Sequence, residues 1–256
     1  MATTSPTPVN PAPMPRTIHY CWFGRGPMPA KALKCIESWK KFCPDYKIVE
    51  WNEDNYDVSA HRYTDDAYAA GDYAFVSDYA RFDILYNHGG VYFDTDVEVI
   101  RNIDDLVGRG PFMGCEKDAP GLTVAPGLVV ASPAGTELFR RILDDYDRIP
   151  YAVNGVRTPG TVVKRVTDTL VDLGLDRDKP GIQTVCGLTV YPAEFFAPYD
   201  DLTGRLDITR NTRSIHWYSK LWIAPAERRR TRYTRIFHRL FGVNCFAFLR
   251  RLLRMD

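Results

Sequence analysis

Long apolar runs are missing from this 256-residue sequence. No stretch of about 18 consecutive apolar residues occurs, so we expect no segment that crosses a membrane. Residues 1–15 are rich in Pro, Thr and Ala but carry no basic segment followed by an apolar run. They lack the pattern of a secretory signal peptide, and we expect a disordered leader there.

The common glycine-rich phosphate loops are also missing. Gly24 and Gly26 are followed by Pro27 and Pro29, which cannot supply the third glycine and the helix start of a dinucleotide-binding loop. The P-loop pattern, GxxxxGK followed by Ser or Thr, occurs nowhere in the chain. Two large classes of nucleotide-binding protein are therefore excluded.

Cysteine pairs at metal-binding spacing are absent as well. None of the six cysteines belongs to a CxxC pair. This spacing gives neither a zinc cluster nor a recognisable disulfide framework, and we expect reduced, mostly packed thiols of a cytosolic protein. The cysteines are Cys21, Cys35, Cys43, Cys115, Cys186 and Cys245.

The charge of the chain is nearly balanced but unevenly distributed. The net charge is +1, yet residues 226–256 hold nine arginines against Glu227 and Asp256, a net of +7. The preceding part is therefore mildly acidic, which does not indicate a nucleic-acid-binding domain. With 45% apolar residues, the chain can bury one sizeable core, and we expect a soluble enzyme with a basic tail.

The beginning of the ordered region predicts an α/β sheet. Residues 17–23 are β-prone, Pro29 opens a helix, and residues 46–51 form a second β-prone run. Apolar residues recur at helical spacing between them: Leu33, Ile36 and Trp39. A strand, a helix and a strand within this distance are typical of an α/β domain.

The middle of the sequence predicts a helix followed by a buried strand. Residues 72–87 form the helix, Gly89-Gly90 ends it, and residues 91–93 form the strand. The helix carries one aromatic stripe: Phe75, Tyr79, Phe82 and Tyr86. Further strands are expected at residues 97–100, 111–115, 127–131 and 189–191, and further helices at residues 136–146 and 162–173.

Two carboxylates, Asp94 and Asp96, follow the predicted strand. If this segment is extended, the two side chains point the same way and Thr95 points away. Converging carboxylates repel each other unless a cation lies between them, and hard divalent ions take such oxygen ligands. A lone Asp-x-Asp more often only solvates the end of a strand, so its context decides.

Asp78 and Arg81 provide that context, because they lie three residues apart on one face of the preceding helix. They could form a surface ion pair of under about 1 kcal/mol. A carboxylate beside a guanidinium also suits the recognition of sugar hydroxyls. The order Asp-x-x-Arg, Gly-Gly, apolar strand, Asp-x-Asp is much rarer than any of its parts.

From about residue 16 to residue 222, the sequence resembles the DXD-containing glycosyltransferases of family 32. That family includes bacterial capsular-polysaccharide enzymes and yeast mannosyltransferases, and it shares a core with the large clostridial glucosylating toxins. The block from Ala74 to Asp96 is the most specific part. The other matching segments are residues 18–24, 38–39, 44–46, 191–192, 195–196 and 215–219.

The resemblance implies a GT-A-type fold: a mixed central sheet flanked by helices. It also implies a nucleotide-sugar donor, usually linked to UDP, and Mn²⁺ or Mg²⁺ as cofactor. Asp78, Arg81, Asp94 and Asp96 would be the catalytic residues. By the resemblance, Asp78 and Arg81 hold the donor sugar, Asp94 contacts ribose and metal, and Asp96 ligates the metal.

Residues outside the central block would complete the donor site. The resemblance implies that Trp22 stacks on the uracil, that His216 or Ser219 adds metal and diphosphate contacts, and that Trp222 closes over the diphosphate. Trp22 could instead belong to the core, and His216 could be a hydrogen-bonded core histidine between Ile215 and Trp217. A histidine ligand would favour Mn²⁺ over Mg²⁺.

The sequence departs from the family at two places. Residues 158–160 read Thr-Pro-Gly where relatives often have Thr-Gly-Pro, and two residues separate Ser219 from Trp222 where the spacing is commonly shorter. Both departures concern the acceptor side and the late loop rather than the donor motifs.

The predicted function is that of a retaining hexosyltransferase in surface-polysaccharide synthesis, with a saccharide or lipid-linked acceptor. Two alternatives remain at this point. One is a toxin-like effector that glycosylates a protein, and the other is a non-catalytic, membrane-associated carbohydrate-binding protein. Intact Asp78, Arg81, Asp94 and Asp96 argue against the latter. The sequence indicates no oligomeric state.

The C-terminal tail predicts a basic amphipathic helix. Helical spacing would place aromatic and aliphatic residues opposite arginines, as in helices that lie on anionic membranes. The alternative is a terminal helix packed on the domain with solvated arginines. The expected organisation is a leader at 1–15, a glycosyltransferase domain at 16–225 and the tail at 226–256. We expect a cytoplasmic protein at the inner face of the membrane, with peripheral contact through the tail.

Overall fold

The computed structural model describes residues 14–116, 121–153, 156–158, 160–219, 234–243 and 245–246. A mixed central sheet runs through this part of the chain, in the order β10-β11-β5-β7-β3-β1-β2, with β6 paired to β5. None of the described helices combines the length and the apolar character needed to cross a bilayer.

The sheet contains both parallel and antiparallel neighbours. Strand β1 pairs in parallel with β2 and β3, and β11 pairs in parallel with β5, whereas β7 is antiparallel to both β3 and β5. The strand bounds are Thr17–Cys21 (β1), Lys47–Trp51 (β2), Gly90–Tyr92 (β3), Phe112–Glu116 (β5), Thr123–Val124 (β6), Val130–Ser132 (β7), Gln183–Val185 (β10) and Leu188–Tyr191 (β11). The predicted β1-helix-β2 opening of an α/β sheet is confirmed.

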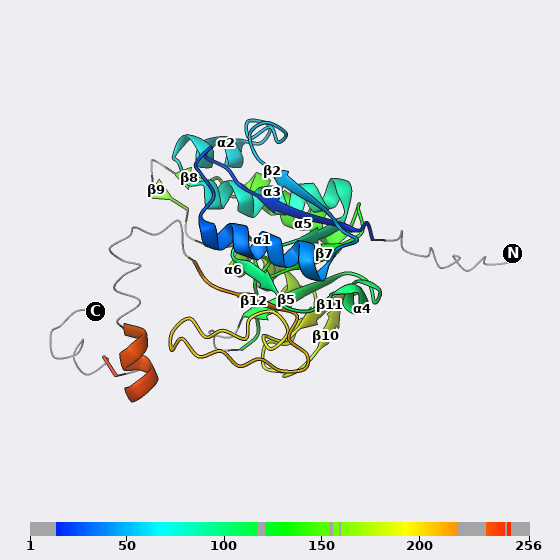
Figure 1. Cartoon of the computed structure of the whole chain (residues 1–256). Coiled ribbons are helices and arrows are strands. Elements are labelled where there is room, and N and C mark those ends of the chain that lie inside the picture. Colours follow the sequence, from blue (N-terminus) through cyan, green and yellow to red (C-terminus); the bar gives the residue numbers. More distant parts are fainter. Residues whose placement is uncertain are drawn as a thin grey trace, which may run out of the picture.

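Helices cover both faces of this sheet (Figure 1). They are Ala30–Phe42 (α1), Arg62–Ala69 (α2), Tyr73–His88 (α3), Asp104–Val107 (α4), Glu137–Arg148 (α5) and Val162–Asp172 (α6). Successive strand residues face opposite sides, so Val91 joins the core beneath α1 and Tyr92 joins the core beneath α3 and α5. The predicted mixed central sheet flanked by helices is confirmed.

Helix α1 buries a different stripe from the one predicted. Leu33 is 50% exposed, whereas Ile36 and Trp39 are buried as expected. The buried face is instead completed by Ala32 and Cys35, which lie with Ile36 and Trp39 at i, i+3, i+4 and i+7. The prediction that Leu33 belongs to the buried face of α1 is therefore wrong.

Most of the short elements were not predicted, although a strand was expected at residues 97–100, where β4 lies. Helix α2 has a polar sequence, and its start is fixed by His61, whose ring accepts a hydrogen bond from the backbone of Tyr63. Two small strand pairs also lie outside the central sheet: Val97–Val99 (β4) with Ser214–His216 (β12), and Ala152–Val153 (β8) with Val156–Arg157 (β9). Strands of two or three residues are defined by their partners rather than by their own sequence.

All six cysteines have free thiols. Cys21, Cys35, Cys43 and Cys115 are buried, as expected for packed thiols, whereas Cys186 is exposed. Burial raises the pKa of the Cys21 thiol to about 12, so this cysteine stays protonated at neutral pH.

His19 on β1 fixes the backbone turn that leads into β3. The indole N–H of Trp51 donates to Nδ1 of His19 at 3.0 Å, and Nε2 of His19 lies 2.9 Å from the carbonyl oxygen of Gly89. Because indole can only donate, Nδ1 must accept and Nε2 must carry the proton. A side chain at Gly90 would meet the backbone of Thr17 at 2.7 Å and the His19 ring at 3.0 Å.

We expect His19 to make folding sensitive to acid. Burial lowers the pKa of His19 from 6.5 to about 4, so the unfolded chain takes up this proton first as the pH falls. Stability is then lost from pH 6.5 down to about pH 4, by up to about 3 kcal/mol from this residue. Urea unfolding across that range should show a shallower pH dependence for His19→Gln. His238→Gln is the control, and equal slopes for His19→Gln and the unchanged protein would contradict the assignment.

Candidate active site

Asp94 and Asp96 lie in a tight turn and not in an extended segment. The amide of Val97 donates to the carbonyl of Asp94 at 3.1 Å, which closes an i to i+3 turn between β3 and β4. The amide of Asp94 also donates to the carbonyl of Gly127 at 3.0 Å. The extended geometry expected from the sequence is therefore wrong, although the two carboxylates still converge through the turn.

His216 reaches the same place from the far end of the chain. It ends strand β12, which pairs antiparallel with β4 so that His216 lies opposite Val97. Its Nε2 is 2.9 Å from Oδ1 of Asp96. One ligand atom from each of Asp94, Asp96 and His216 lies within 4.8 Å of the others. The structure thus joins residues separated by 120 positions into one cluster.

The chain after His216 continues to wrap around Asp96. The backbone N–H of Ser219 donates to Oδ2 of Asp96 at 2.6 Å, and the N–H of Trp217 donates to the carbonyl of Asp96 at 3.0 Å. Ser219 therefore contacts the cluster through its backbone amide, a role that its side-chain chemistry did not indicate. Trp222 lies outside the described residues.

The electrostatic environment shifts the pKa values of Asp94 and Asp96 in opposite directions. Burial alone would raise the pKa of Asp96, but the His216 ring and the Ser219 amide outweigh it and lower that pKa. Burial dominates at Asp94 and raises its pKa, with Arg81 acting in the opposite direction. Burial would lower the pKa of His216, but Asp96 outweighs this and raises it. Asp96 is therefore the more firmly ionised of the two acids.

The three side chains fit a divalent cation. Two carboxylates and one imidazole form an oxygen-rich donor set with a single nitrogen, which suits Mn²⁺. Nδ1 of His216 is buried and has no hydrogen-bond partner among the described residues. The other ring nitrogen, Nε2, contacts Asp96. Asp96 and His216 are thus held together and face Asp94.

Arg81 on α3 links this cluster to Asp78. One guanidinium nitrogen, Nη2, donates to Oδ1 of Asp78 at 2.8 Å and lies 3.3 Å from Oδ1 of Asp94. Its Nε donates to the carbonyl of Ser77 at 3.2 Å, and the guanidinium lies 5.0 Å from the ring centre of Tyr92. With 4% of its side chain exposed, Arg81 is a buried cation between two carboxylates, not the surface ion pair of the alternative interpretation.

Burial of this group changes the acidity of Asp78. Burial raises the pKa of Asp78 to about 7, and the nearby Arg81 only partly offsets that rise. Asp78 can therefore exchange a proton near neutral pH, while Arg81 stays charged because its neighbours raise its pKa further. A carboxyl group that can either donate or accept a hydrogen bond suits contact with a hydroxyl-rich ligand.

Gly127 closes the cluster from the turn at residues 126–128, where the sequence had predicted the start of a strand. A Cβ atom at this position would lie 2.1 Å from Oδ2 of Asp94 and 3.5 Å from Nη1 of Arg81. Only glycine leaves room for the Asp94 carboxylate in its present position. No spacing in the sequence pointed to this residue.

We therefore expect Gly127→Ala to displace the Asp94 carboxylate without unfolding the protein. The atom that must move is the end of a side chain, so the free energy of unfolding should change by no more than about 1 kcal/mol. A displaced ligand should reduce turnover by about 100-fold. Gly26→Ala is the matched control, because a Cβ there meets nothing within 4 Å. Full turnover in Gly127→Ala would contradict the assignment.

Trp22 lies at the same edge of the sheet as the acidic turn. It follows β1 directly, while Asp94 lies two residues after the adjacent parallel strand β3. Its indole N–H donates to the carbonyl of Gly26 at 2.7 Å, and the side chain is partly buried against the core beneath α1. Carboxyl ends of parallel strands commonly carry ligand sites, so this position is compatible with the predicted donor contact.

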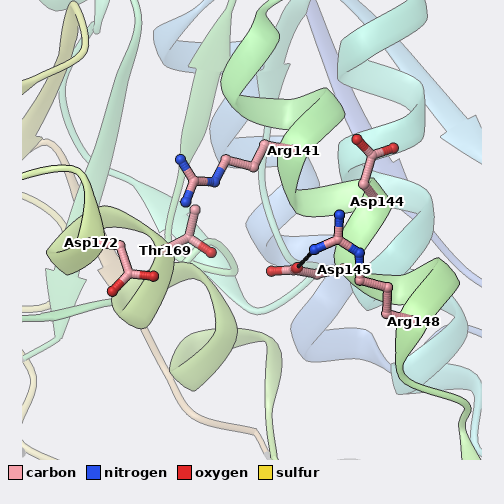
Figure 2. A pocket seen from close by; sticks show the side chains of 6 residues that line it. All are labelled: Arg141, Asp144, Asp145, Arg148, Thr169 and Asp172. Atoms are coloured by element: carbon pink, nitrogen blue, oxygen red, sulfur yellow. Dashed lines mark ion pairs between the residues drawn. The ribbon is translucent and has the colours of Figure 1, made fainter.

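A polar cleft elsewhere on the molecule contains none of these residues. Figure 2 shows it between α5 and α6, where Arg148 pairs with Asp145 at 3.9 Å. Its volume is about 380 Å³. The lining residues are Arg141, Asp144, Asp145, Arg148, Thr169 and Asp172. Charged groups of both signs already lie side by side there, and the cleft shows no convergence comparable to that around Asp94 and Asp96.

Residues 29–113 match the family model described as "Glycosyltransferase sugar-binding region containing DXD motif". This segment of the chain is similar to a glycosyltransferase sugar-binding region. The matched segment covers a third of the chain and contains Asp78 and Arg81, and Asp94-Thr95-Asp96 is its one Asp-x-Asp sequence. The match supports sugar transfer as the activity of the cluster. No curated protein matches the sequence.

Solved structures with a distant likeness to this chain include glycosyltransferases. The glycosyltransferase PaToxG is 19% identical over 64% of this chain and 73% of its own, with a TM-score of 0.46. A glycosyltransferase involved in glycosylation of the major capsid of PBCV-1 is 10% identical over 85% and 99%, with a TM-score of 0.46. The galactosyltransferase LgtC, with donor and acceptor sugar analogues, is 12% identical over 83% and 93%, with a TM-score of 0.43.

Proposed function

We propose that the protein is a metal-dependent GT-A-type glycosyltransferase of the family 32 kind. It would move a hexose from a nucleotide sugar, UDP-linked in the first instance, to a saccharide or lipid-linked acceptor in surface-polysaccharide synthesis. One observation carries the proposal: Arg81 joins Asp78 to the cluster of Asp94, Asp96 and His216 within hydrogen-bonding and ion-pair distances. The motif match within residues 29–113 supports the same activity.

The donor would be held along the edge of the sheet. Asp94, Asp96 and His216 would bind a divalent cation, and Trp22 would stack on the base. A cation bound there supplies Lewis-acid stabilisation of the charge that develops on the departing diphosphate. The backbone of Ser219 keeps the Asp96 carboxylate oriented through its 2.6 Å hydrogen bond. Trp222 would close over the diphosphate.

Asp78 and Arg81 would hold the donor sugar. Among the groups around them, Asp78 can accept from or donate to sugar hydroxyls, since its pKa is raised to about 7. Arg81 can only donate, and its bonds to Ser77 and Asp78 hold the guanidinium in one orientation. A guanidinium fixed in this way would hold a sugar hydroxyl in a defined position.

We propose transfer with retention of anomeric configuration. None of the residues assigned to the donor is required as a nucleophile, because the departing phosphate oxygen can take the proton of the acceptor hydroxyl on the same face of the sugar. In that displacement, the bond from the anomeric carbon to the diphosphate breaks and the bond to the acceptor oxygen forms. The residues described above supply orientation and charge.

A panel of nucleotide sugars tests this function. Purified protein with Mn²⁺ should hydrolyse one donor, or a few, slowly in the absence of an acceptor, and EDTA should stop the reaction. Release of nucleoside diphosphate is the readout, and NMR of the freed sugar reports its anomeric configuration. Binding of a donor without any hydrolysis or transfer would instead favour a non-catalytic carbohydrate-binding protein. Hydrolysis unaffected by EDTA would overturn metal dependence.

A further inference from the structure

The helix at residues 234–241 lies on the domain through its polar side. Nε of Arg235 donates to the carbonyl of Asp201 at 2.7 Å, and its Nη2 pairs with the buried carboxylate of the same residue. Nδ1 of His238 lies 3.3 Å from the carbonyl of Leu202. Arg235 and His238 are three residues apart and therefore share one face.

The opposite face of this helix is apolar and points away from the domain. Its four large apolar side chains are between 48% and 68% exposed, and Val243, just beyond the helix, is 44% exposed. These four residues are Ile236, Phe237, Leu240 and Phe241. The rings of Phe237 and Phe241 lie 6.4 Å apart in a stacked arrangement. A terminal helix that simply completed the core would be turned the other way, with its apolar face inward.

The charge of the surrounding sequence indicates what this face contacts. Residues 226–256 carry a net charge of +7. A symmetric contact between two copies through this face would bring two such segments together, and like charges would oppose it. Anionic lipid headgroups are complementary to the arginines, and the acyl region is complementary to the exposed aromatic and aliphatic side chains. Large exposed apolar patches are typical of surfaces that contact proteins or membranes, and the net positive charge of this part of the sequence favours an anionic membrane.

We propose that the apolar face of helix 234–241 docks on an anionic lipid bilayer. The helix lies in the interface with Ile236, Phe237, Leu240 and Phe241 inserted and the arginines at the headgroups. This inference rests on the orientation of the helix and is independent of the proposed sugar transfer. In this proposal, helix 234–241 is the element that makes the peripheral membrane contact expected from the sequence.

The docked helix lies close to the candidate active site. The guanidinium of Arg235 lies 5.6 Å from the ring centre of Tyr199, and Tyr199 contacts Trp217 with ring centres 5.3 Å apart. Trp217 in turn donates its backbone N–H to Asp96 at 3.0 Å. Three successive contacts therefore connect the inward face of this helix to the acidic turn.

Co-sedimentation of the full-length chain with vesicles tests the proposal. The protein should bind phosphatidylcholine vesicles that contain phosphatidylglycerol, and bind pure phosphatidylcholine vesicles much more weakly. Added salt should weaken the binding because it screens the arginines. The triple variant Phe237→Ser, Leu240→Ser and Phe241→Ser should lower the partition coefficient by at least about tenfold. These side chains are exposed, so the variant should keep the circular dichroism spectrum of the unchanged protein.

A second triple variant controls for the loss of exposed apolar side chains in general. Val156→Ser, Ile182→Ser and Ile208→Ser remove side chains that are 49% to 71% exposed elsewhere on the molecule. Vesicle binding should be unchanged in this control. Equal binding by both triple variants and the unchanged protein, or no binding to anionic vesicles at all, would overturn the proposal. So would light scattering that shows a dimer which only the first variant dissociates, because the face would then bind a second copy.

Discussion

Asp96→Asn should abolish sugar-donor turnover while leaving the protein folded. The amide keeps the size of the side chain and an oxygen that can accept from the Ser219 backbone, but it removes the negative charge next to His216. A cation that stabilises the departing diphosphate contributes several kcal/mol, so turnover should fall by at least about 100-fold. Donor hydrolysis with Mn²⁺ measures this, and calorimetric titration with Mn²⁺ should show weaker binding in the same variant.

The matched control for this variant is Asp83→Asn. Asp83 lies on α3, where it accepts hydrogen bonds from Tyr56 and Asn87 and takes no part in the acidic cluster. Its replacement should leave turnover and Mn²⁺ binding unchanged. Turnover in Asp96→Asn comparable to that of the unchanged protein would remove Asp96 from the assignment, and equal loss in Asp83→Asn would indicate a general structural effect.

Arg81→Ala should have the largest effect on stability of any change at the site. Arg81 is the buried cation between Asp78 and Asp94, and its removal leaves two buried carboxylates without their partner. Breaking a buried ion pair in this way costs about 3–5 kcal/mol. Urea unfolding at neutral pH measures the loss.

Arg81→Lys separates the charge of this residue from its shape. An ammonium group restores the charge but cannot reproduce the guanidinium contacts to Ser77, Asp78 and Asp94. The variant should remain folded, with turnover reduced by about 100-fold because an oriented donor is lost. Arg140→Ala is the surface control: its pair with Asp144 is 40% and 45% exposed and should contribute less than about 1 kcal/mol. An Arg81→Ala variant as stable as Arg140→Ala would contradict the buried-pair account.

The sequence predicted the central part of the fold because its elements are long and strongly patterned. Helix α3 carries an aromatic stripe at helical spacing, and the parallel strands β1 and β2 lie in β-prone runs; the structure contains all three close to their predicted bounds. Strands β4 and β12 have three residues each and exist because they pair with one another. Their pairing brings His216 to Asp96, which is why spacing alone left a core histidine and a metal ligand as alternatives.

The sequence correctly predicted that the carboxylates of Asp94 and Asp96 lie close together, but it predicted the wrong backbone conformation for them. Alternation along an extended strand predicted that Asp94 and Asp96 point the same way, but a turn closed by the Val97 amide brings them together. The turn depends on Gly127, whose carbonyl accepts from Asp94 and whose missing side chain leaves room for the carboxylate. Such close approach between distant segments has no periodic signal in a sequence.

The contact between Ser219 and Asp96 also could not be predicted from residue type. A serine suggests a hydroxyl contact, whereas the structure uses its backbone amide, which any residue except proline could supply. The tail gives the opposite case: its amphipathic pattern was visible in the sequence, but which side faces the domain was not. The contact of Arg235 with Asp201 decides that point, because it directs the polar face inward.

Anomalous X-ray scattering from Mn²⁺, in crystals grown with Mn²⁺ and UDP, tests the central claim most directly. One strong peak is expected among Asp94, Asp96 and His216, with UDP phosphate oxygens beside it, and this peak should be absent from Asp96→Asn crystals. A peak at another acidic cluster, or UDP bound at the sheet edge with no manganese between Asp94 and Asp96, would contradict it.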